Sequence, residues 1–307
     1  MGAFQNIGLQ DYFKRYGIRY GLLRGIFMVN PIHAVKDYEN KKILYYRKMS
    51  GKLSRWMRFS EENPKGLEYG KDGVGECIWI YWRQGFDQAP AIVKRCAESV
   101  QRHCNIPVIL LSEENVQDYV RMPQYIKEKL EKGTISAAVY SDLLRMSLLE
   151  HYGGTWIDAT VFLTGPLPDY ITQSRLFAYQ DSFGLIENPA RYANWLLHAQ
   201  KGNRLIRRTR NILFAYWGKK DHAPEYLFSY LVFTALARED EEEDAYIPYA
   251  SSEYTGLLLK ELDRTYREEI YRHIISLSTV HKLTYKLKKH VEGGKDTLYE
   301  RIIRERL

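Results

Sequence analysis

TISAAVYSDLLRMSLLEHYGGTWIDATVFLTGPLP, residues 134–168, is the stretch that decides the fold of this 307-residue chain. Its first half has the pattern of an apolar helix, and Gly153-Gly154 can end that helix because glycine readily adopts the left-handed conformation found after a helix C-terminus. Residues 155–163 then have the composition of a strand, with β-branched and aromatic side chains. Gly165-Pro166 marks the end of that strand.

The helix in this stretch carries an isolated charged pair, Asp142 and Arg145. Three positions apart on a helix, the two side chains are neighbours on one face. The rest of the helix is apolar on most sides, and aspartate and arginine are almost never fully buried without a partner. The two charges therefore need either each other or a polar ligand.

The strand after the glycines carries one carboxylate, Asp158, with the hydroxyl of Thr160 two residues further on. Side chains alternate across a strand, so Asp158 and Thr160 are expected on the same face as Trp156. In α/β sheets, ligands lie outside the carboxyl ends of the strands. Asp158 there could hold a hard divalent cation, with a substrate phosphate supplying other ligands. The alternative is an aspartate that is satisfied by backbone amides.

Strands and helices alternate on either side of this stretch. Residues 77–82 and 107–111 are short apolar runs typical of strands buried on both faces, and residues 92–104 between them have helical spacing. This alternation predicts the α/β class, with a mostly parallel sheet flanked by helices. Further along the chain we expect strands at 176–180 and 274–277, and helices at 188–200, 203–217, 224–238 and 251–272.

The chain divides into three parts by composition. Residues 1–70 form a basic, aromatic segment with helical patterns, and a glycine-rich linker over 60–75 joins it to the second part. Residues 71–286 hold the alternating strands and helices, and residues 287–307 form a charged helical tail. We therefore expect one α/β domain with a helical appendage at each end.

The positive charge of the chain is confined to the N-terminal segment. Residues 1–60 contain 12 Lys and Arg against 3 Asp and Glu, a charge of +9, whereas the remainder contains 33 against 35, a charge of −2. Binding to nucleic acid is not expected, because the basic excess lies in one segment and no nucleic-acid-binding motif is present. A basic aromatic segment instead suggests a surface of anionic phospholipid.

The N-terminal helices admit two interpretations. Aromatic residues interleaved with Lys14, Arg15 and Arg19 can lie in a membrane interface, or they can pack on the protein itself with the charged ends in solvent. We expect peripheral membrane contact through residues 1–60. No apolar run is long enough to span a bilayer, and no signal peptide is expected. Three cysteines without metal-site spacing favour a reducing compartment, and hence the cytoplasm.

Aromatic side chains cluster at the first predicted strand. Trp79, Tyr81 and Trp82 lie at or near its carboxyl end, where a ring could stack on a nucleobase. The same residue types are equally at home in a hydrophobic core. Composition alone leaves both possibilities open.

The chain resembles the capsular polysaccharide synthesis glycosyltransferases, which are related to the family 32 glycosyltransferases of GT-A fold. The resemblance rests on IWIYWRQG (residues 78–85), on the central block SAAVYSDLLRMSLLEHYGGTWIDATVFLTGPLP (residues 136–168), and on HKLTYK (residues 281–286). It covers about residues 77–286. It implies a Rossmann-like GT-A domain that binds a nucleotide-sugar.

The resemblance also implies roles for the charged residues of the central block. The family's helix supplies an aspartate and an arginine to the donor sugar and nucleotide, and these match Asp142 and Arg145. The family's strand supplies an Asp-x-Asp motif that holds the ribose and a divalent cation. Asp158-Ala159-Thr160 stands at that position, so the second carboxylate is missing.

The HKLTYK segment is expected to supply the remaining groups. Similarity to retaining enzymes of this fold implies that His281 joins Asp158 and Thr160 on an Mn²⁺ or Mg²⁺ ion, and that Lys282 and Lys286 contact the diphosphate. A lone histidine is also common as a structural hydrogen-bonding residue. Polar groups after the strand at 176–180 are expected to face the sugar, namely Asp181, Glu187 and Asn188.

The resemblance implies a retaining glycosyltransferase. It would transfer a hexose, glucose or galactose, from a UDP-sugar to a polyprenyl-diphosphate-linked glycan at the inner face of the plasma membrane, in bacterial capsule or exopolysaccharide synthesis. The departure from Asp-x-Asp supports one alternative, a non-catalytic scaffold that binds nucleotide-sugars within a capsule assembly complex. Donor binding without turnover would distinguish the second from the first.

Overall fold

The computed structural model describes residues 9–29, 38–181, 188–287 and 289–304. Five strands form its central sheet in the order β3-β2-β5-β8-β7. β2 is parallel to both β3 and β5, whereas β8 is antiparallel to β5 and to β7. Four of these strands therefore run one way and β8 runs against them, which confirms the α/β class. Two of the four pairings are parallel and two are antiparallel, so the sheet is mixed. The strand bounds are β2 (Ile78–Tyr81), β3 (Val108–Leu111), β5 (Gly154–Ile157), β7 (Leu176–Gln180) and β8 (Tyr192–Ala199).

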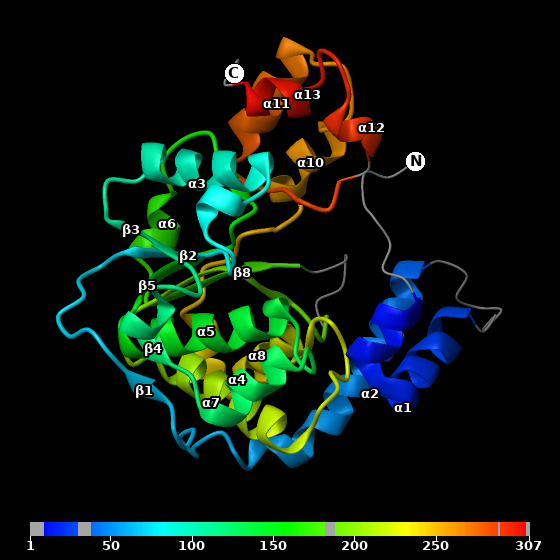
Figure 1. The fold of residues 1–307 in the computed structure, drawn as a ribbon, viewed down its shortest axis with the longest axis vertical. Coiled ribbons are helices and arrows are strands. Elements are labelled where there is room, and N and C mark those ends of the chain that lie inside the picture. The colour runs from blue at the N-terminus through cyan, green and yellow to red at the C-terminus, as the bar shows by residue number, and fades with distance from the viewer. Residues whose placement is uncertain (1–8, 30–37, 182–187, 288, 305–307) are drawn as a thin grey trace.

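Helices cover both faces of this sheet (Figure 1). Trp79 of β2 belongs to the buried cluster that includes α5, whereas its neighbours Ile78 and Ile80 belong to the cluster that includes α3. The strands are thus buried on both sides, which explains their continuous apolar runs. The helices on the first face are α4 (Gln124–Glu131), α5 (Ala137–His151), α7 (Arg204–Lys219) and α8 (Phe228–Glu239). Those on the second are α3 (Ala91–His103), α10 (Leu257–Glu261), α11 (Glu268–Leu277) and α13 (Leu298–Ile303).

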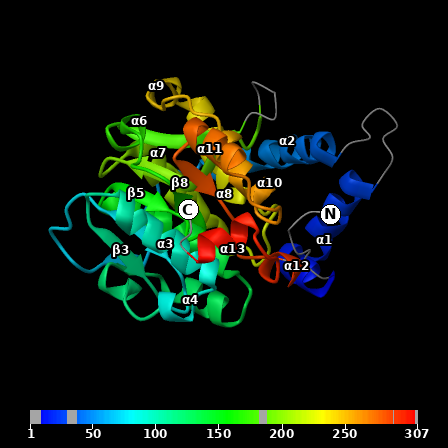
Figure 2. The same ribbon diagram turned by 90° about the horizontal axis from the view of Figure 1, so that it is seen from above.

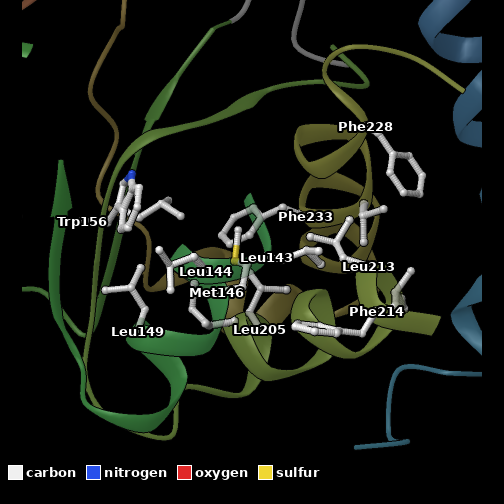
Figure 3. Packing of buried hydrophobic residues seen from close by; sticks show 14 of the residues in the cluster. Leu143, Leu144, Met146, Leu149, Trp156, Leu205, Leu213, Phe214, Phe228 and Phe233 are labelled. Carbon is white, nitrogen blue, oxygen red and sulfur yellow. The ribbon is translucent and has the colours of Figure 1, made fainter. Parts of the chain in front are cut away.

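The apolar character of α5 follows from its position. It lies between the sheet and α7, and its residues Leu143, Leu144 and Met146 have no exposed surface. Figure 3 shows these side chains packed toward Leu213 of α7 and Phe233 of α8. Charged residues of α5 are therefore found with partners: Asp142 and Arg145 near its middle pair with each other, and Glu150 near its C-terminus pairs with Arg210.

Gly153 and Gly154 end α5 as the sequence predicts. Their φ angles are 76° and 91°, a region that side chains other than glycine rarely adopt. A Cβ atom on Gly154 would lie 2.4 Å from the carbonyl oxygen of Cys77. The glycine pair therefore permits both the sharp turn from helix to strand and the close approach of β5 to β2.

The single strand expected over 155–163 is wrong. β5 ends at Ile157, and a tight turn over 158–160 comes next, closed by the bond from the amide of Val161 to the carbonyl of Asp158. The chain then continues as β6 (Val161–Leu163), which leaves the central sheet and pairs antiparallel with β9 (Val280–Lys282). Asp158 and Thr160 consequently lie in a turn at the carboxyl end of β5 and not on a strand face.

Two further secondary-structure predictions are wrong, and the helix expected at 251–272 is divided into shorter helices with an interruption over 262–267. The helix expected at 188–200 is the strand β8, which is buried along its whole length and paired on both sides. The strand expected at 274–277 is instead the last turn of α11, and the strand of this region, β9, comes three residues later. At β8, pairing with β5 and β7 outweighs the local preference of the residues. Residues 274–277 instead continue the amphipathic helix α11, whose Ile274 packs in the core.

The N-terminal segment forms two helices at one side of the α/β body, α1 (Leu9–Val29) and α2 (Tyr38–Met57) (Figure 2). α2 buries Tyr45, Tyr46 and Met49 in the same cluster as α5, α7 and α8. α1 is interrupted at Gly17, which has a positive φ of 63°. The structure thus confirms the helical N-terminus and packs its second helix against the protein itself.

The remaining elements are short. β1 (Glu68–Tyr69) pairs with β4 (Val120–Arg121) beside the main sheet. None of the helices in the described ranges is long and apolar enough to cross a membrane. The short helices are η1 (Phe86–Gln88), η2 (Val116–Asp118), α6 (Asp169–Thr172), α9 (Glu241–Ala245), η3 (Tyr254–Gly256) and α12 (Lys289–Glu292).

Candidate functional site

A cavity of about 470 Å³ opens at the carboxyl ends of β2 and β5. Its wall includes the residues directly after these two strands, the N-terminal half of α5, and the segments 223–230 and 282–286. Arg15 of α1 also lines it. This is the position where open α/β sheets bind ligands. The volume falls in the range of pockets that hold a small organic ligand.

Arg145 is the centre of the charged network in this cavity. Its guanidinium lies 3.1 Å from Asp142 and 2.9 Å from Asp158, and it donates to the backbone carbonyl of Asn194 at 2.8 Å. Only 5% of its side chain is exposed. The helical spacing brings Asp142 to one side of Arg145, and the turn after β5 brings Asp158 to the other. The pair predicted from the sequence is therefore a triad.

The two aspartates differ in their protonation equilibria. Burial raises the pKa of Asp142 to about 6, although Arg145 and the hydroxyl of Ser229, which donates at 2.9 Å, oppose this shift. Burial also opposes the charge of Asp158, but Lys282 and Arg145 together hold the pKa of that carboxyl below its usual value. Asp158 is thus a stable anion, whereas Asp142 titrates near neutral pH.

Lys282 reaches this network through the pairing of β6 with β9, which sets Lys282 opposite Val161. Its ammonium donates to Asp158 Oδ2 at 2.7 Å and to Thr160 Oγ1 at 2.9 Å. The other oxygen of Asp158 accepts from Trp156 Nε1 and from Arg145, each at 2.9 Å. Both carboxylate oxygens of Asp158 and the hydroxyl of Thr160 are therefore engaged.

His281 points away from the cavity, because neighbouring residues on β9 face opposite sides. It has no exposed surface, and its Nε2 lies 3.0 Å from the hydroxyl of Thr164. Burial lowers the pKa of this imidazole to about 4. The structure does not bring His281 together with Asp158 and Thr160.

The residues present do not fit the expected Mn²⁺ or Mg²⁺ ion. A hard cation needs several free oxygen ligands, yet the oxygens of Asp158 and Thr160 are bound to cationic or indole donors. His281 cannot complete the set from its buried position. Among residues 9–29, 38–181, 188–287 and 289–304, no group of three or more His, Cys, Asp or Glu side chains could hold a metal ion.

The aromatic residues of β2 separate into core and cavity. Trp79 is completely buried and donates its indole N–H to the carbonyl of Gly153, so it does not contact the site. Tyr81 lines the cavity, as does Trp82, whose ring packs edge-on against Tyr285 at 5.0 Å. Two of the three rings expected to contact a nucleotide are thus in position to do so.

The polar residues after β7 lie elsewhere. The amide of Asp181 donates to the carbonyl of Arg191 at 2.7 Å, and Asn188 is fully buried, with its side-chain oxygen accepting the amide of Ala190. Neither residue lines the cavity. Asn188 is buried because it bonds to the segment directly before β8 through the amide of Ala190. Glu187 lies outside the described residues.

Several residues that line the cavity were missed in the sequence. They include Tyr226 in the turn before α8, Tyr230 in the first turn of α8, and Arg15. The guanidinium of Arg15 stands 5.3 Å from the centre of the Tyr226 ring. Nothing distinguished Arg15 from the other basic residues of its segment.

Comparisons with known proteins identify the family of this chain. The family model described as capsular polysaccharide synthesis protein matches residues 27–302, which is more than half of the chain. The O-glycosyltransferase PaGT of Phomopsis amygdali is 26% identical over 161 residues, covering 47% of this chain. The match covers 39% of PaGT, so the chain spans well under two thirds of that relative.

Two solved structures of glycosyltransferases are also similar. The PaToxG glycosyltransferase has a TM-score of 0.40 at 15% identity, over 86% of this chain and 97% of that one. The apo form of the glycosyltransferase GlyE from Streptococcus pneumoniae TIGR4 has a TM-score of 0.40 at 11% identity, over 76% of this chain and 63% of that one.

Proposed function

The chain belongs to the capsular polysaccharide synthesis protein family, and from this premise we propose that it is a retaining glycosyltransferase. It transfers a hexose, glucose or galactose, from a UDP-sugar to a polyprenyl-diphosphate-linked glycan in capsule or exopolysaccharide synthesis. The observation that carries the proposal is the network of Asp142, Arg145, Asp158 and Lys282 in a cavity at the carboxyl ends of β2 and β5.

The chemistry of the cavity suits a nucleotide-sugar donor. Tyr81 and Trp82 offer ring surface to a base at one part of the wall, and Asp142 offers a carboxylate to sugar hydroxyls. Lys282 and Lys286 offer positive charge to a diphosphate. The glycosyl group passes through an oxocarbenium-like state while charge builds on the departing diphosphate. Fixed cationic donors that meet this charge lower the barrier.

Donor binding and turnover test this proposal directly. UDP-glucose or UDP-galactose at a hundredfold excess over its dissociation constant should stabilise the folded protein by about 2.7 kcal/mol. Differential scanning fluorimetry measures this stabilisation, and release of UDP measures slow hydrolysis of the donor. A panel of UDP-sugars that produces neither response would refute the proposal, and ADP-ribose serves as a nucleotide control outside the expected class.

A non-catalytic scaffold is the second candidate. The observation in its favour is that both oxygens of Asp158 are already bound within the protein. Under this alternative, UDP-sugars stabilise the fold, but neither hydrolysis nor transfer to a lipid-linked acceptor occurs. Mass spectrometry of a lipid-linked acceptor after incubation with the donor separates the two candidates.

The N-terminal helix α1 supports the membrane part of the proposal. Ile18, Leu22 and Ile26 are 74%, 57% and 56% exposed and recur every four residues, so they form one apolar stripe. α2, by contrast, buries its apolar side within the protein. The N-terminal 60 residues carry a charge of +9 (12 basic and 3 acidic residues). An apolar stripe on a basic segment matches an anionic phospholipid surface at the inner face of the plasma membrane.

α1 also relates that surface to the cavity. Arg15 lines the cavity, and Arg24 of the same helix pairs with the buried Glu225 at 2.9 Å in the cavity wall. A helix lying on a bilayer would therefore place the cavity beside the lipid surface. This placement favours an acceptor whose anchor stays in the membrane.

The triple substitution Ile18→Ser/Leu22→Ser/Ile26→Ser should release the protein from vesicles of phosphatidylglycerol. Each large apolar side chain contributes on the order of 1 kcal/mol or more when it leaves water, so we expect partitioning to fall at least about tenfold. Sedimentation with the vesicles measures it. The matched control is Tyr249→Ser/Tyr254→Ser/Leu277→Ser, which removes three exposed apolar side chains elsewhere. Equal partitioning of both variants and the native protein would show that α1 does not dock.

A further inference from the structure

The ammonium of Lys282 lies where the turn after β5 would otherwise present oxygen ligands. It is bonded to Asp158 Oδ2 and to Thr160 Oγ1, the outer residues of Asp158-Ala159-Thr160. Two oxygens that converge on one point form half of a site for a hard cation. In this chain the ammonium group of Lys282 occupies that point.

The position of Lys282 is fixed by the backbone on both sides. Lys282 on β9 pairs with Val161 on β6. The backbone amide of the following residue, Leu283, donates to the carbonyl of Thr160 at 2.8 Å. Nζ also lies 5.7 Å from the ring centre of Trp195. A charge held by a sheet pairing and two hydrogen bonds needs little reorganisation when a ligand arrives.

Lys282 keeps the capacity to bind an anion. An ammonium has three N–H donors, and the bonds to Asp158 and Thr160 use two of them within the described residues. The side chain lines the cavity and is 27% exposed. One donor can therefore reach a phosphate oxygen while the other two hold the ammonium in place.

We infer that Lys282 takes the place of the divalent cation, so that this protein binds nucleoside diphosphates and transfers the sugar without a metal. The inference rests on the proposed function and names the group that meets the charge of the leaving diphosphate. In the step itself, the bond between C1 and the diphosphate oxygen breaks and its electron pair stays on that oxygen. The acceptor hydroxyl oxygen bonds to C1, and its proton passes to the departing diphosphate.

Binding of UDP, measured by isothermal titration calorimetry, tests the inference. The dissociation constant in excess EDTA should lie within about twofold of the value in MnCl₂, because a metal bridge would otherwise contribute several charge-assisted contacts. UDP that binds only with Mn²⁺ or Mg²⁺ would overturn the inference and leave the proposed function intact. Failure of UDP to bind under either condition would instead count against the proposed function.

Substitutions of Lys282 provide a second test of the inference. Lys282→Ala should weaken UDP binding in EDTA by about 10- to 100-fold, the range for loss of a charge-assisted hydrogen bond. Lys282→Arg keeps the charge and should recover most of the loss. The control is Lys260→Ala on α10, which removes an exposed lysine outside the cavity and should bind UDP as the native protein does. Unchanged binding by Lys282→Ala would overturn the inference.

A variant that rebuilds a metal site completes the test. Thr160→Asp/Lys282→Ser places a second carboxylate at the turn and removes the ammonium, so UDP binding should become dependent on Mn²⁺. Circular dichroism and the melting temperature confirm that the variant is folded. Tight binding of UDP to this folded variant in EDTA would contradict the role assigned to Lys282.

Discussion

Arg145→Met should lower the free energy of unfolding by about 3–5 kcal/mol, the cost of removing one partner from a buried ionic network. Methionine fills much of the volume but leaves Asp142 and Asp158 facing each other without the guanidinium that both contact. The carbonyl of Asn194 also loses its donor. Urea unfolding followed by circular dichroism measures the loss.

The matched control is Arg272→Met on α11. This arginine pairs with Glu268 on the surface and 74% of its side chain is exposed. Exposed pairs contribute only about 0–1 kcal/mol, so this variant should unfold almost as the native protein does. If both substitutions lower the free energy of unfolding by similar amounts, the network around Arg145 stabilises the protein no more than an exposed ion pair does.

The loss of unfolding free energy in Arg145→Met should increase as the pH rises. In the native protein, burial raises the pKa of Asp142 to about 6, and without Arg145 that pKa should rise further. The pKa of Asp158, held low by Lys282 and Arg145, should rise as well. A carboxyl whose pKa is raised by folding destabilises the protein when it is charged, and this penalty disappears as the pH falls. The deficit should therefore be larger at pH 8 than at pH 5.

The sequence of residues 134–168 contained most of the features that position the site. The apolar helix, the glycine pair and the carboxylate after a buried strand have local causes, and the structure has each of them. The neighbourhood of Asp142 and Arg145 follows from helical spacing alone. The contact between Asp158 and Arg145 could not be predicted from the sequence, because the distance between these two side chains depends on how α5 packs against β5.

The failures have a common physical origin in long-range pairing. Tyr192–Ala199 contains alanine and leucine, which favour a helix, but it forms a strand because β5 and β7 pair with it on both sides. The turn at Asp158–Thr160 contains no glycine or proline to mark it. The direction of His281 and Lys282 depends on which of them faces the core, and this was decided by the pairing of β9 with β6.

Asp158→Asn should reduce the turnover number for sugar transfer by at least about 100-fold, the usual cost of removing one preorganised electrostatic group from an active site. Asparagine keeps an oxygen that can accept from Arg145 and Trp156, but its amide nitrogen cannot accept from Lys282. The ammonium thus loses its anionic anchor. UDP release and product formation at saturating donor measure the effect.

The fold should survive this substitution. One charge-assisted bond is lost, and the expected fall in the free energy of unfolding is about 1–3 kcal/mol, less than the stability of a typical domain. Asp169→Asn is the control, since Asp169 is exposed at the start of α6 and does not line the cavity. Full turnover by folded Asp158→Asn would refute the assignment of Asp158 to the donor site.

The double variant Asp158→Asn/Lys282→Ala shows whether the two residues act together. If Asp158 acts chiefly by holding the ammonium 2.7 Å away, removing both should cost little more than removing either one. We therefore expect the turnover number of the double variant to lie within a few-fold of the weaker single variant. If the fold-losses in turnover number of the two single variants multiply in the double variant, then Asp158 and Lys282 act independently. Asp158 would then contact the donor directly, and Lys282 would bind the diphosphate without being held by Asp158.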